Sequence, residues 1–517
     1  MKLTGQDFKV KIVDLDTGEH TVILNEKDTA ILGLRSLDRV KVVAKEASIT
    51  ALVETTKSLV GQGFAGLSKD EMEELDLEQG ENKVYIIPTQ RPKSIEVIKK
   101  KMKGVELQKD EIQLIVKDIV ERNLSDIELA AYVTANYINP MNLREIKDLT
   151  MAMVETGDII EIDREPIFDF HSIGGVPGNK VTLLVVPIVA AAGLCIPKTC
   201  SRAISSAGGT ADILETLCNV TLSAHQIKSI SERIGGVIAW GGGVNIAPAD
   251  DIIIRAEYPL AIDPYSQVIA SVMAKKKAVG ADYFLLDIPT GPGTKVEDFK
   301  LARRYARDFI ELGEQLNMRV ECAITYGGQP IGRSIGPAVE AKEALMALEG
   351  KTVSSSVIEK STSLSGIILE LAGVTTAGKK MAAELLNSGK ALEKFREILE
   401  AQEGNPDIKS DAVPIGDKKV DFTAQREGYI AHIDNKCLVR IVRLAGAPHD
   451  KGAGMIIHKK KGHQVEKGEA LFTIYGTNER KVNNALRLAQ KRPPMLIEGM
   501  VIERVPSIHH IESKFDE

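Results

Sequence analysis

The sequence predicts a multidomain α/β protein: a helical domain and a mostly parallel α/β domain, with an N-terminal β-rich domain before them and a C-terminal α+β domain after them. Three observations carry this prediction. Residues 1–88 alternate apolar and polar side chains, residues 95–157 repeat apolar side chains at helical spacing, and strand-like runs alternate with glycine-rich turns and helices from residue 166 onward. A chain of 517 residues is long enough for about two to four domains of ordinary size.

The N-terminal β-rich domain is predicted over residues 1–88. Four runs in it, FKVKIVDL, HTVILNE, DRVKVVAKE and KVYIIPTQ, show the alternation of half-buried strands, and the turns DTG, GQG and EQG punctuate the segment. One or two short helices complete this compact domain. The segment TQRPKS (89–94) is expected to link it to the next domain, because proline and small polar residues interrupt both kinds of periodicity.

Residues 95–157 are predicted to form a helical domain of helix hairpins. Apolar side chains recur every three or four residues in KDEIQLIVKDIVERN and in SDIELAAYVTANYI, as one face of an amphipathic helix requires. Ser125 and Asn142 stand where helix N-caps are expected, since their side-chain oxygens can accept from N–H groups of the first turn. Gly157 stands where the last helix should end.

The α/β domain is predicted over residues 166–240 and 282–415, and the C-terminal α+β domain over residues 420–517. VTLLVVPIVAAAGL has mostly helical character, whereas GGVIAWGGG is predicted as a strand that runs into a loop and ADYFLLDIPTG as a buried strand. Strands that alternate with helices favour a mostly parallel sheet. Residues 335–404 are expected to be helical, and β-type alternation then returns. Near the end, KKKGH (459–463) is expected to be a solvent-exposed hairpin.

Composition argues against several classes of protein. Hydrophobic residues make up 44% and charged residues 27% of the chain, as in ordinary globular proteins. With 72 acidic against 66 basic residues, the formal charge of −6 gives no support for a nucleic-acid-binding or membrane-surface protein. The start is unlike a signal peptide, and the longest apolar stretch, 181–197, is too short and broken to span a membrane. Five cysteines without CxxC spacing predict reduced thiols in a cytoplasmic protein, with no disulfide framework and no zinc site.

Three polar, glycine-rich loops in the α/β domain are candidates for an anion site. They are HSIGGVPGNK (171–180), SRAISSAGGTADILE (201–215) and DIPTGPGTKV (287–296), and each follows an apolar segment. Backbone N–H groups in glycine turns can converge on an anion, hydroxyls add donors, and Lys or Arg supplies countercharge. Any one loop alone is better explained as a tight turn with a helix cap. Neither GxxxxGK[ST] nor an opening GxGxxG occurs, which argues against an ATPase or a Rossmann dinucleotide site.

The same segments resemble a known family, the thymidine/pyrimidine-nucleoside phosphorylases. SRAISSAGGTADILE is similar to the family signature, HSIGGVPGNK to its phosphate-binding loop, and LAIDPYSQVIASVMAKKKAVGAD to its substrate-binding helix region. GAGMIIHKKKGHQVEKGEALFTIY resembles its C-terminal β domain, so the likeness covers residues 95–505. The N-terminal domain and IPTGPGTKV resemble the archaeal branch, the AMP phosphorylases. The resemblance implies the type II nucleoside phosphorylase fold, with a segment near 248–278 returning to the helical domain.

The resemblance also implies an activity and the residues that carry it. Members of the branch convert AMP and other nucleoside 5′-monophosphates, with inorganic phosphate as co-substrate, to free base and ribose 1,5-bisphosphate in nucleotide salvage and AMP catabolism. Asp263 is implied as the catalytic proton donor. The residues implied to bind substrate are Gly175, Ser201, Arg202, Ala203, Ile204, Ser205, Ser206, Thr210, Ser271 and Lys295. No cofactor, metal, nucleic acid or membrane is expected, and the expected assembly is a homo-oligomer built from dimers.

Two positions depart from the pyrimidine-specific pattern. Pyrimidine enzymes usually carry a Lys directly before the His-Ser of the first loop, where this chain has Phe170. A phosphate contact at that position is therefore lost, or is replaced by Lys180. The Arg that reads a pyrimidine base is normally followed by Asp-Val-Thr, whereas Arg255 is followed by AEYPLAIDP. These departures argue against recognition of a pyrimidine ring edge.

Asp263 has two possible roles. Phosphorolysis of an N-glycosidic bond needs phosphate held in line with C1′ and a proton for the departing base, which a carboxylic acid can donate. Asp263 precedes a predicted helix, however, and Asp followed by Pro is also an ordinary N-cap with Pro at the first helical position. The residues alone favour the cap, and the resemblance favours the acid. Ser271, two helical turns later on roughly the same face, can reach the same ligand.

Two other functions remain open. A thymidine or uridine phosphorylase of the same family would be distinguished by the residue at position 170 and by the base-reading Arg. A non-catalytic oligomeric scaffold that kept the fold would use the N-terminal domain as its interaction surface. Phosphate-dependent release of base from a nucleotide would exclude the scaffold, and a comparison of AMP with adenosine and uridine would separate the two enzymes.

Overall fold

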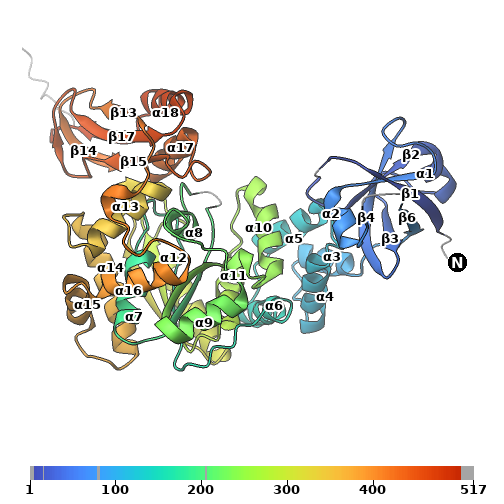
Figure 1. Ribbon diagram of the computed structural model, residues 1–517, viewed down its shortest axis with the longest axis horizontal. Coiled ribbons are helices and arrows are strands. Elements are labelled where there is room, and N and C mark those ends of the chain that lie inside the picture. Colours follow the sequence, from blue (N-terminus) through green and yellow to red (C-terminus); the bar gives the residue numbers. More distant parts are fainter. Residues whose placement is uncertain (1–4, 16, 79–81, 204–205, 502–517) are drawn as a thin grey trace, which may run out of the picture. The chain divides into compact units, whose positions relative to one another are not determined.

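The computed structural model describes residues 5–15, 17–78, 82–203 and 206–501. It forms two compact units: unit 1 comprises Met1–Ile159 and Asn245–Ala278, and unit 2 comprises Ile160–Val244 and Val279–Glu517. Unit 1 holds a β-barrel and a set of helices, and unit 2 holds a parallel α/β fold and the C-terminal domain (Figure 1).

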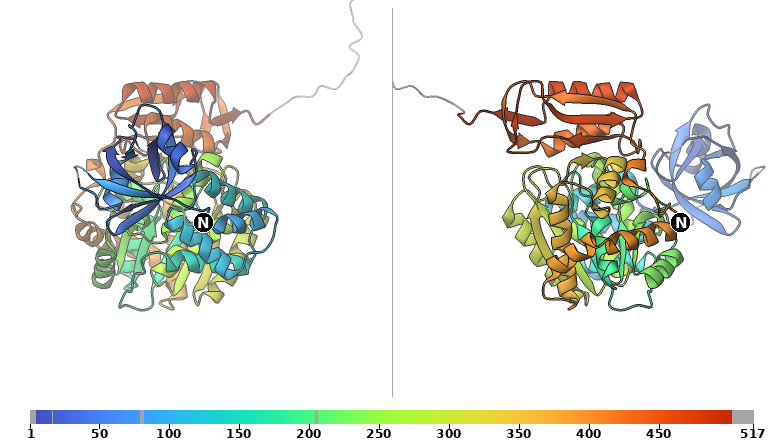
Figure 2. Two further views of the ribbon diagram at one scale, coloured as in Figure 1. Left: turned by 90° about the vertical axis from the view of Figure 1, so that its right-hand side faces the viewer. Right: turned by 60° about the vertical axis from the view of Figure 1, so that its left-hand side comes forward.

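A closed six-stranded barrel forms the N-terminal part of unit 1 (Figure 2). The strand order is β1-β5-β2-β4-β3-β6, and pairing of β1 with β6 closes the barrel, which leaves no unpaired edge strand. Phe8, Val22 and Val42 are among the inward-facing side chains of its apolar core. The predicted β-rich domain is confirmed. Its elements are β1 (Gln6–Ile12), β2 (Thr21–Asn25), α1 (Glu26–Leu32), β3 (Arg39–Ala44), β4 (Ala47–Thr56), β5 (Phe64–Leu67), α2 (Lys69–Glu74) and β6 (Lys83–Pro88).

Six helices make up the rest of the described part of unit 1. They are α3 (Ser94–Met102), α4 (Lys109–Val120), α5 (Asp126–Ile138), α6 (Leu143–Glu155), α10 (Pro248–Leu260) and α11 (Tyr265–Ala278). The side chains of Ser125 and Asn142 accept hydrogen bonds from the third residues of α5 and α6, so both predicted N-caps are confirmed. Helix α6 ends at Glu155, two residues before Gly157, which also agrees with the sequence pattern.

A parallel sheet organises unit 2. Its strands are β7 (Phe168–Ser172), β8 (Ile196–Cys200), β9 (Gly236–Trp240), β10 (Tyr283–Thr290) and β11 (Arg319–Tyr326). β10 pairs in parallel with β11 and with β7, and β8 pairs in parallel with β9. A parallel bridge between Ile167 and Cys195 joins the two groups, which gives the order β11-β10-β7-β8-β9. The mostly parallel sheet predicted from the sequence is confirmed.

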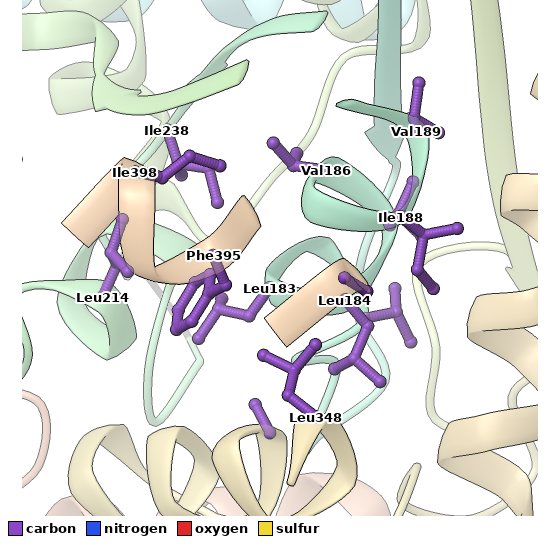
Figure 3. Packing of buried hydrophobic residues seen from close by; sticks show 14 of the residues in the cluster. Leu183, Leu184, Val186, Ile188, Val189, Leu214, Ile238, Leu348, Phe395 and Ile398 are labelled. Atoms are coloured by element: carbon purple, nitrogen blue, oxygen red, sulfur yellow. The ribbon is translucent and has the colours of Figure 1, made fainter. Parts of the chain in front are cut away.

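Helices cover this sheet and bury a continuous apolar core. They are α7 (Thr182–Ala191), α8 (Thr210–Leu214), α9 (Ala224–Ile234), α12 (Phe299–Gln315), α13 (Pro337–Leu348), α14 (Ser355–Leu371), α15 (Gly378–Asn387) and α16 (Lys390–Ala401). In Figure 3, Leu183 and Leu184 of α7 lie among Phe395 of α16 and Leu348 of α13. Each fully buried side chain of this kind contributes about 1.5–3 kcal/mol.

Helix α7 is apolar on all sides, a composition found in buried core helices and in membrane spans. It has 10 residues, and its first nine, Thr182–Ala190, are all buried within unit 2. No helix among the described residues is long and apolar enough to cross a membrane.

The C-terminal domain combines two antiparallel sheets with two helices. One sheet has the order β12-β15-β17-β13 and the other β16-β14-β18. Its first strand, β12, comes from the α/β region at Ser334–Ile335, at the start of the stretch predicted to be helical (335–404), and this strand ties the domain to that region. The remaining elements are β13 (Lys418–Thr423), β14 (Gly428–Ile433), α17 (Asn435–Ala445), β15 (Gly454–Ile457), β16 (Gln464–Val465), β17 (Ala470–Gly476), α18 (Glu479–Lys491) and β18 (Met495–Glu498).

Candidate active site

Three glycine-rich loops leave the same edge of the parallel sheet in unit 2. The first loop (173–180) follows β7, the signature loop (201–203 and 206–209 among the described residues) follows β8, and the third loop (291–296) follows β10. Because these strands are parallel, their carboxyl ends lie at one edge of the sheet, which is where open α/β sheets bind ligands.

The first and third loops touch through Gly175. Its φ is +85°, and a Cβ atom there would lie 2.3 Å from the backbone N of Lys295. Only glycine allows this approach, so Gly175 brings two anion-type loops together. The third loop is itself tightened by buried Thr294, whose hydroxyl donates to the carbonyls of Gly291 and Val296 at 2.8 Å each.

We expect Gly175→Ala to raise the KM for inorganic phosphate about tenfold or more, because the new methyl group must push the third loop away from the first by an ångström or more. Gly174→Ala is the matched control. Gly174 has a φ of +86°, but the nearest atom to its added Cβ is 4.0 Å away. Both variants therefore carry the same backbone strain of about 1–3 kcal/mol. Thermal midpoints of the two variants report the backbone strain that they share, and steady-state kinetics report the effect of the loop contact. Equal phosphate KM values in Gly175→Ala and Gly174→Ala would contradict the role given to Gly175.

Asp212 organises the signature loop. Its Oδ2 accepts hydrogen bonds from the backbone N–H groups of Ala203 at 2.6 Å and Gly209 at 3.0 Å. A Cβ at Gly209 would lie 2.6 Å from the carbonyl oxygen of Ser201, so the two ends of the loop are in direct contact. The loop is thus folded back on itself at the start of α8 and held by a carboxylate that is almost completely buried.

Arg202 forms a forked ion pair with Glu215 and stacks on Trp240. Its Nη1 and Nη2 donate to the two carboxylate oxygens of Glu215 at 2.7 and 2.5 Å, and its guanidinium carbon lies 4.6 Å from the centre of the Trp240 ring. The hydrogen bond from Arg202 is the main reason why the pKa of Glu215 falls to about 2, with a further contribution from Lys451. In this structure Arg202 holds α8 to the strand edge, and its role in substrate binding stays a prediction.

The predicted site residues divide between the two units. Ser201, Gly175 and Lys295 are exposed on the loop edge of unit 2, and Arg202, Ala203, Ser206 and Thr210 are partly exposed there. Ile204 and Ser205 fall outside the described residues. In unit 1, Asp263 is exposed two residues before α11, and Ser271 is half-buried on α11.

Helix α11 begins two residues after Asp263. The N–H group of Val268 donates to the carbonyl of Pro264 at 3.0 Å, which is the first hydrogen bond of α11. The N-cap is the residue whose carbonyl accepts this first bond, so Pro264 takes that place and Asp263 precedes it. Helix α11 therefore begins one residue later than the Asp-Pro pattern placed it, and a capping role of the Asp263 side chain stays a prediction.

Lys180 is not available to replace the phosphate contact missing at Phe170. Its side chain is completely buried, its Nζ lies 2.9 Å from Oε2 of Glu343, and it donates to the carbonyls of Ile331 and Ser334 at 3.0 and 3.2 Å. Phe170 itself belongs to the apolar core beneath the sheet. The sequence hypothesis that Lys180 contacts phosphate was wrong, because the lysine serves a buried ion pair.

The KKKGH hairpin is only partly solvent-exposed. Lys460 is 8% exposed, and its Nζ donates to the carbonyls of Pro330 and of Gly332, the latter at 2.8 Å. Burial, with a smaller effect of the Lys180 charge, lowers the pKa of Lys460 to about 8. The expectation of a solvated hairpin was wrong for this residue, because the C-terminal domain inserts it into the loop that follows β11 (327–333).

Sequence reasoning gave no role to several residues that shape the signature loop. Asp212 and Glu215 stand three residues apart beside Arg202, a spacing that places carboxylates on one helical face and could have indicated an ion-pair network. Trp240 and Lys451 had no such signal, because both come from distant parts of the chain. Among the described residues, no group of three or more His, Cys, Asp or Glu side chains is placed to hold a metal ion.

Comparison with known proteins identifies the family. Residues 95–157 match the helical bundle domain of the glycosyl transferase family, residues 164–392 match its a/b domain, and residues 429–494 match the pyrimidine nucleoside phosphorylase C-terminal domain. The chain is 50% identical to the AMP phosphorylase of Methanosarcina mazei over 98% of its own length and 99% of that relative. It is 52% identical to the AMP phosphorylase of Thermococcus kodakarensis, covering 97% and 99% of the two chains. AMP phosphorylase 1 of Archaeoglobus fulgidus is 51% identical, covering 96% and 98%. Identity at this level over nearly the whole length shows that the chain belongs to the AMP phosphorylase family.

Proposed function

We propose that the protein catalyses the phosphorolysis of AMP to adenine and ribose 1,5-bisphosphate. The observation that carries the proposal is the identity to relatives named AMP phosphorylase, in alignments that cover nearly the full length of both chains. The contact between the first and third loops supports it, since two glycine-rich turns with exposed Lys295 beside them suit a polyanionic substrate.

The proposed reaction is a displacement at C1′ of the ribose. An oxygen of inorganic phosphate attacks C1′, the bond from C1′ to the base nitrogen breaks, and its electron pair stays on the base. Asp263 donates its proton to that base, so that no unstabilised anion departs. In this proposal the glycine-rich loops hold the phosphate groups, and Ser271 orients the nucleotide. The chemistry requires neither a metal nor an organic cofactor.

We expect AMP to be a much better substrate than adenosine, with kcat/KM higher by about 10–100-fold. Hydrogen bonds to a charged phosphate are each worth about 1.5–3 kcal/mol, and adenosine forgoes those made to the 5′-phosphate. The measurement is release of adenine with and without inorganic phosphate, with uridine as a second comparison. Equal turnover of adenosine and AMP would exclude a nucleotide-specific enzyme, and preference for uridine would favour the pyrimidine nucleoside alternative.

The proposal extends to other nucleoside 5′-monophosphates as substrates. It also covers the oligomeric state of the enzyme, its metabolic role and its cellular compartment. We expect a homo-oligomer built from dimers, which the exposed apolar side chains Ile127, Tyr137 and Ile138 on α5 support. We place the reaction in nucleotide salvage and AMP catabolism in the cytoplasm. All five cysteines are free thiols, as suits a reducing compartment.

A further inference from the structure

Lys451 of the C-terminal domain reaches the carboxylates that shape the signature loop. Its Nζ lies 3.1 Å from Oδ1 of Asp212 and 2.8 Å from Oε2 of Glu215. These are the carboxylates that accept from the backbone of the signature loop and from Arg202. One lysine from a different domain therefore touches both anchors of the loop.

The backbone around Lys451 is fixed by several hydrogen bonds. Its carbonyl accepts from the N–H of Ala338 at 3.1 Å, at the start of α13. The neighbouring Asp450 accepts from the N–H and the hydroxyl of Thr477 at 2.9 and 2.7 Å, and the carbonyl of Gly452 accepts from Gly416 at 2.9 Å. Lys451 therefore belongs to a turn whose backbone is held in place, so its ammonium can fix the positions of the two carboxylates that it contacts.

A second contact joins the same two parts of unit 2. Arg443, near the end of α17, donates to the carbonyl of Ser206 at 3.2 Å. At the other end of that helix, Asn435 donates to the carbonyl of Gly327 at 3.0 Å, and its Cβ is 3.4 Å from where a Cβ of Gly293 would lie. Helix α17 therefore spans from the third loop to the signature loop.

The two carboxylates Asp212 and Glu215 are balanced by the two cations that contact them, Arg202 and Lys451. Asp212 and Glu215 bring two negative charges next to a site that must accept anions, and Arg202 alone compensates one of them. Lys451 compensates the other. A net negative charge beside the loop would repel a phosphate group, since an uncompensated charge about 8 Å away at an effective dielectric of about 20–40 weakens binding about 5–30-fold.

We propose that Lys451 is a positioning residue of the phosphate site, through which the C-terminal domain neutralises Asp212 and Glu215 and fixes the signature loop for anion binding. The proposal rests on the proposed function only in taking the signature loop as the place where phosphate binds. Lys451 acts through the two carboxylates and takes no part in the chemical step.

The test is Lys451→Met, which keeps the length of the side chain and removes its charge. We expect the KM for inorganic phosphate to rise about 5–30-fold, with kcat changed less than threefold. Lys451→Arg should restore most of the affinity. Lys418→Met is the matched control: it removes an ion pair with Asp417 at 2.6 Å in the same domain, on strand β13, and should leave the kinetics unchanged.

A double-mutant cycle separates the electrostatic role from a merely structural one. The double variant Glu215→Gln/Lys451→Met has lost one negative and one positive charge, so its phosphate KM should return to within about threefold of the wild-type value. An unchanged phosphate KM in Lys451→Met, or a double variant whose phosphate KM stays as high as that of Lys451→Met, would overturn the proposal. Inorganic phosphate that binds the folded protein raises its thermal midpoint. The size of this rise should rank the variants by phosphate affinity in the same order as KM, and it needs no nucleotide. Failure of wild-type protein to cleave AMP would thus refute the proposed function, whereas the role of Lys451 would still be decided by these thermal midpoints.

Discussion

Replacing Asp263 with Asn is expected to lower kcat for AMP phosphorolysis by about 10²–10⁴-fold, the usual contribution of general-acid assistance. Asn has nearly the same shape as Asp but cannot give up a proton to a departing base. AMP binding should change much less. The thermal midpoint should stay close to that of the wild type, because Asp263 is exposed and Asn caps a helix about as well as Asp does.

The control for this variant is Asp110→Asn. Asp110 is an exposed carboxylate in the first turn of α4, in the same unit, and its loss should be silent in turnover. If Asp263 were only a helix-capping group, Asn would serve equally well. Asp263→Ala would then lower the free energy of unfolding by about 1 kcal/mol and leave kcat nearly unchanged. A nearly normal kcat in Asp263→Asn would mean that the proton donor lies elsewhere.

The order of the elements and the place of the loops could be predicted because both depend on local patterns. The run ADYFLLDIPTG is apolar enough to be a buried strand, and its glycine marks the end of β10. Ser125 and Asn142 could be predicted as caps because a cap needs only the backbone of its own helix. The three loops could also be predicted from local sequence, because their glycine and hydroxyl content follows from the turns they make.

The electrostatics of the site could not be predicted, because the partners are far apart in sequence. Nothing near Lys460 indicates that it will be buried against the carbonyl of Gly332. The partner of Lys451 is likewise set by the docking of the C-terminal domain on α8. A lysine in a polar hairpin is expected to be exposed unless its tertiary contacts are known, since a lysine usually keeps its ammonium in water even where its stem is buried.

Lys180 shows the same limit within one glycine-rich loop. A lysine that ends a loop similar to a phosphate-binding loop looks like a phosphate ligand. The fold instead places it under the loop, where Glu343 of α13 lies 2.9 Å away. Burial raises the pKa of Glu343, but the Lys180 ammonium and the backbone donors Arg333 and Ser334 together bring it below its ordinary value. The Glu343 carboxylate is therefore favoured in its ionised form, and its contact with Lys180 connects the first loop to the helix that leads from β12.

Lys180→Met is accordingly expected to destabilise the protein by about 3–5 kcal/mol, since removal of one partner leaves a buried charge without compensation. The added substitution Glu343→Gln should recover much of this loss, because Gln keeps an acceptor for the N–H groups of Arg333 and Ser334 without the charge. Chemical denaturation of the two variants measures both effects. If Lys180 bound phosphate instead, Lys180→Met would raise the KM for phosphate while unfolding at nearly the wild-type denaturant concentration, and Glu343→Gln would give no recovery. The expected result is the opposite: a loss of stability that the second substitution reverses, with phosphate affinity kept in whatever fraction of the molecules remains folded.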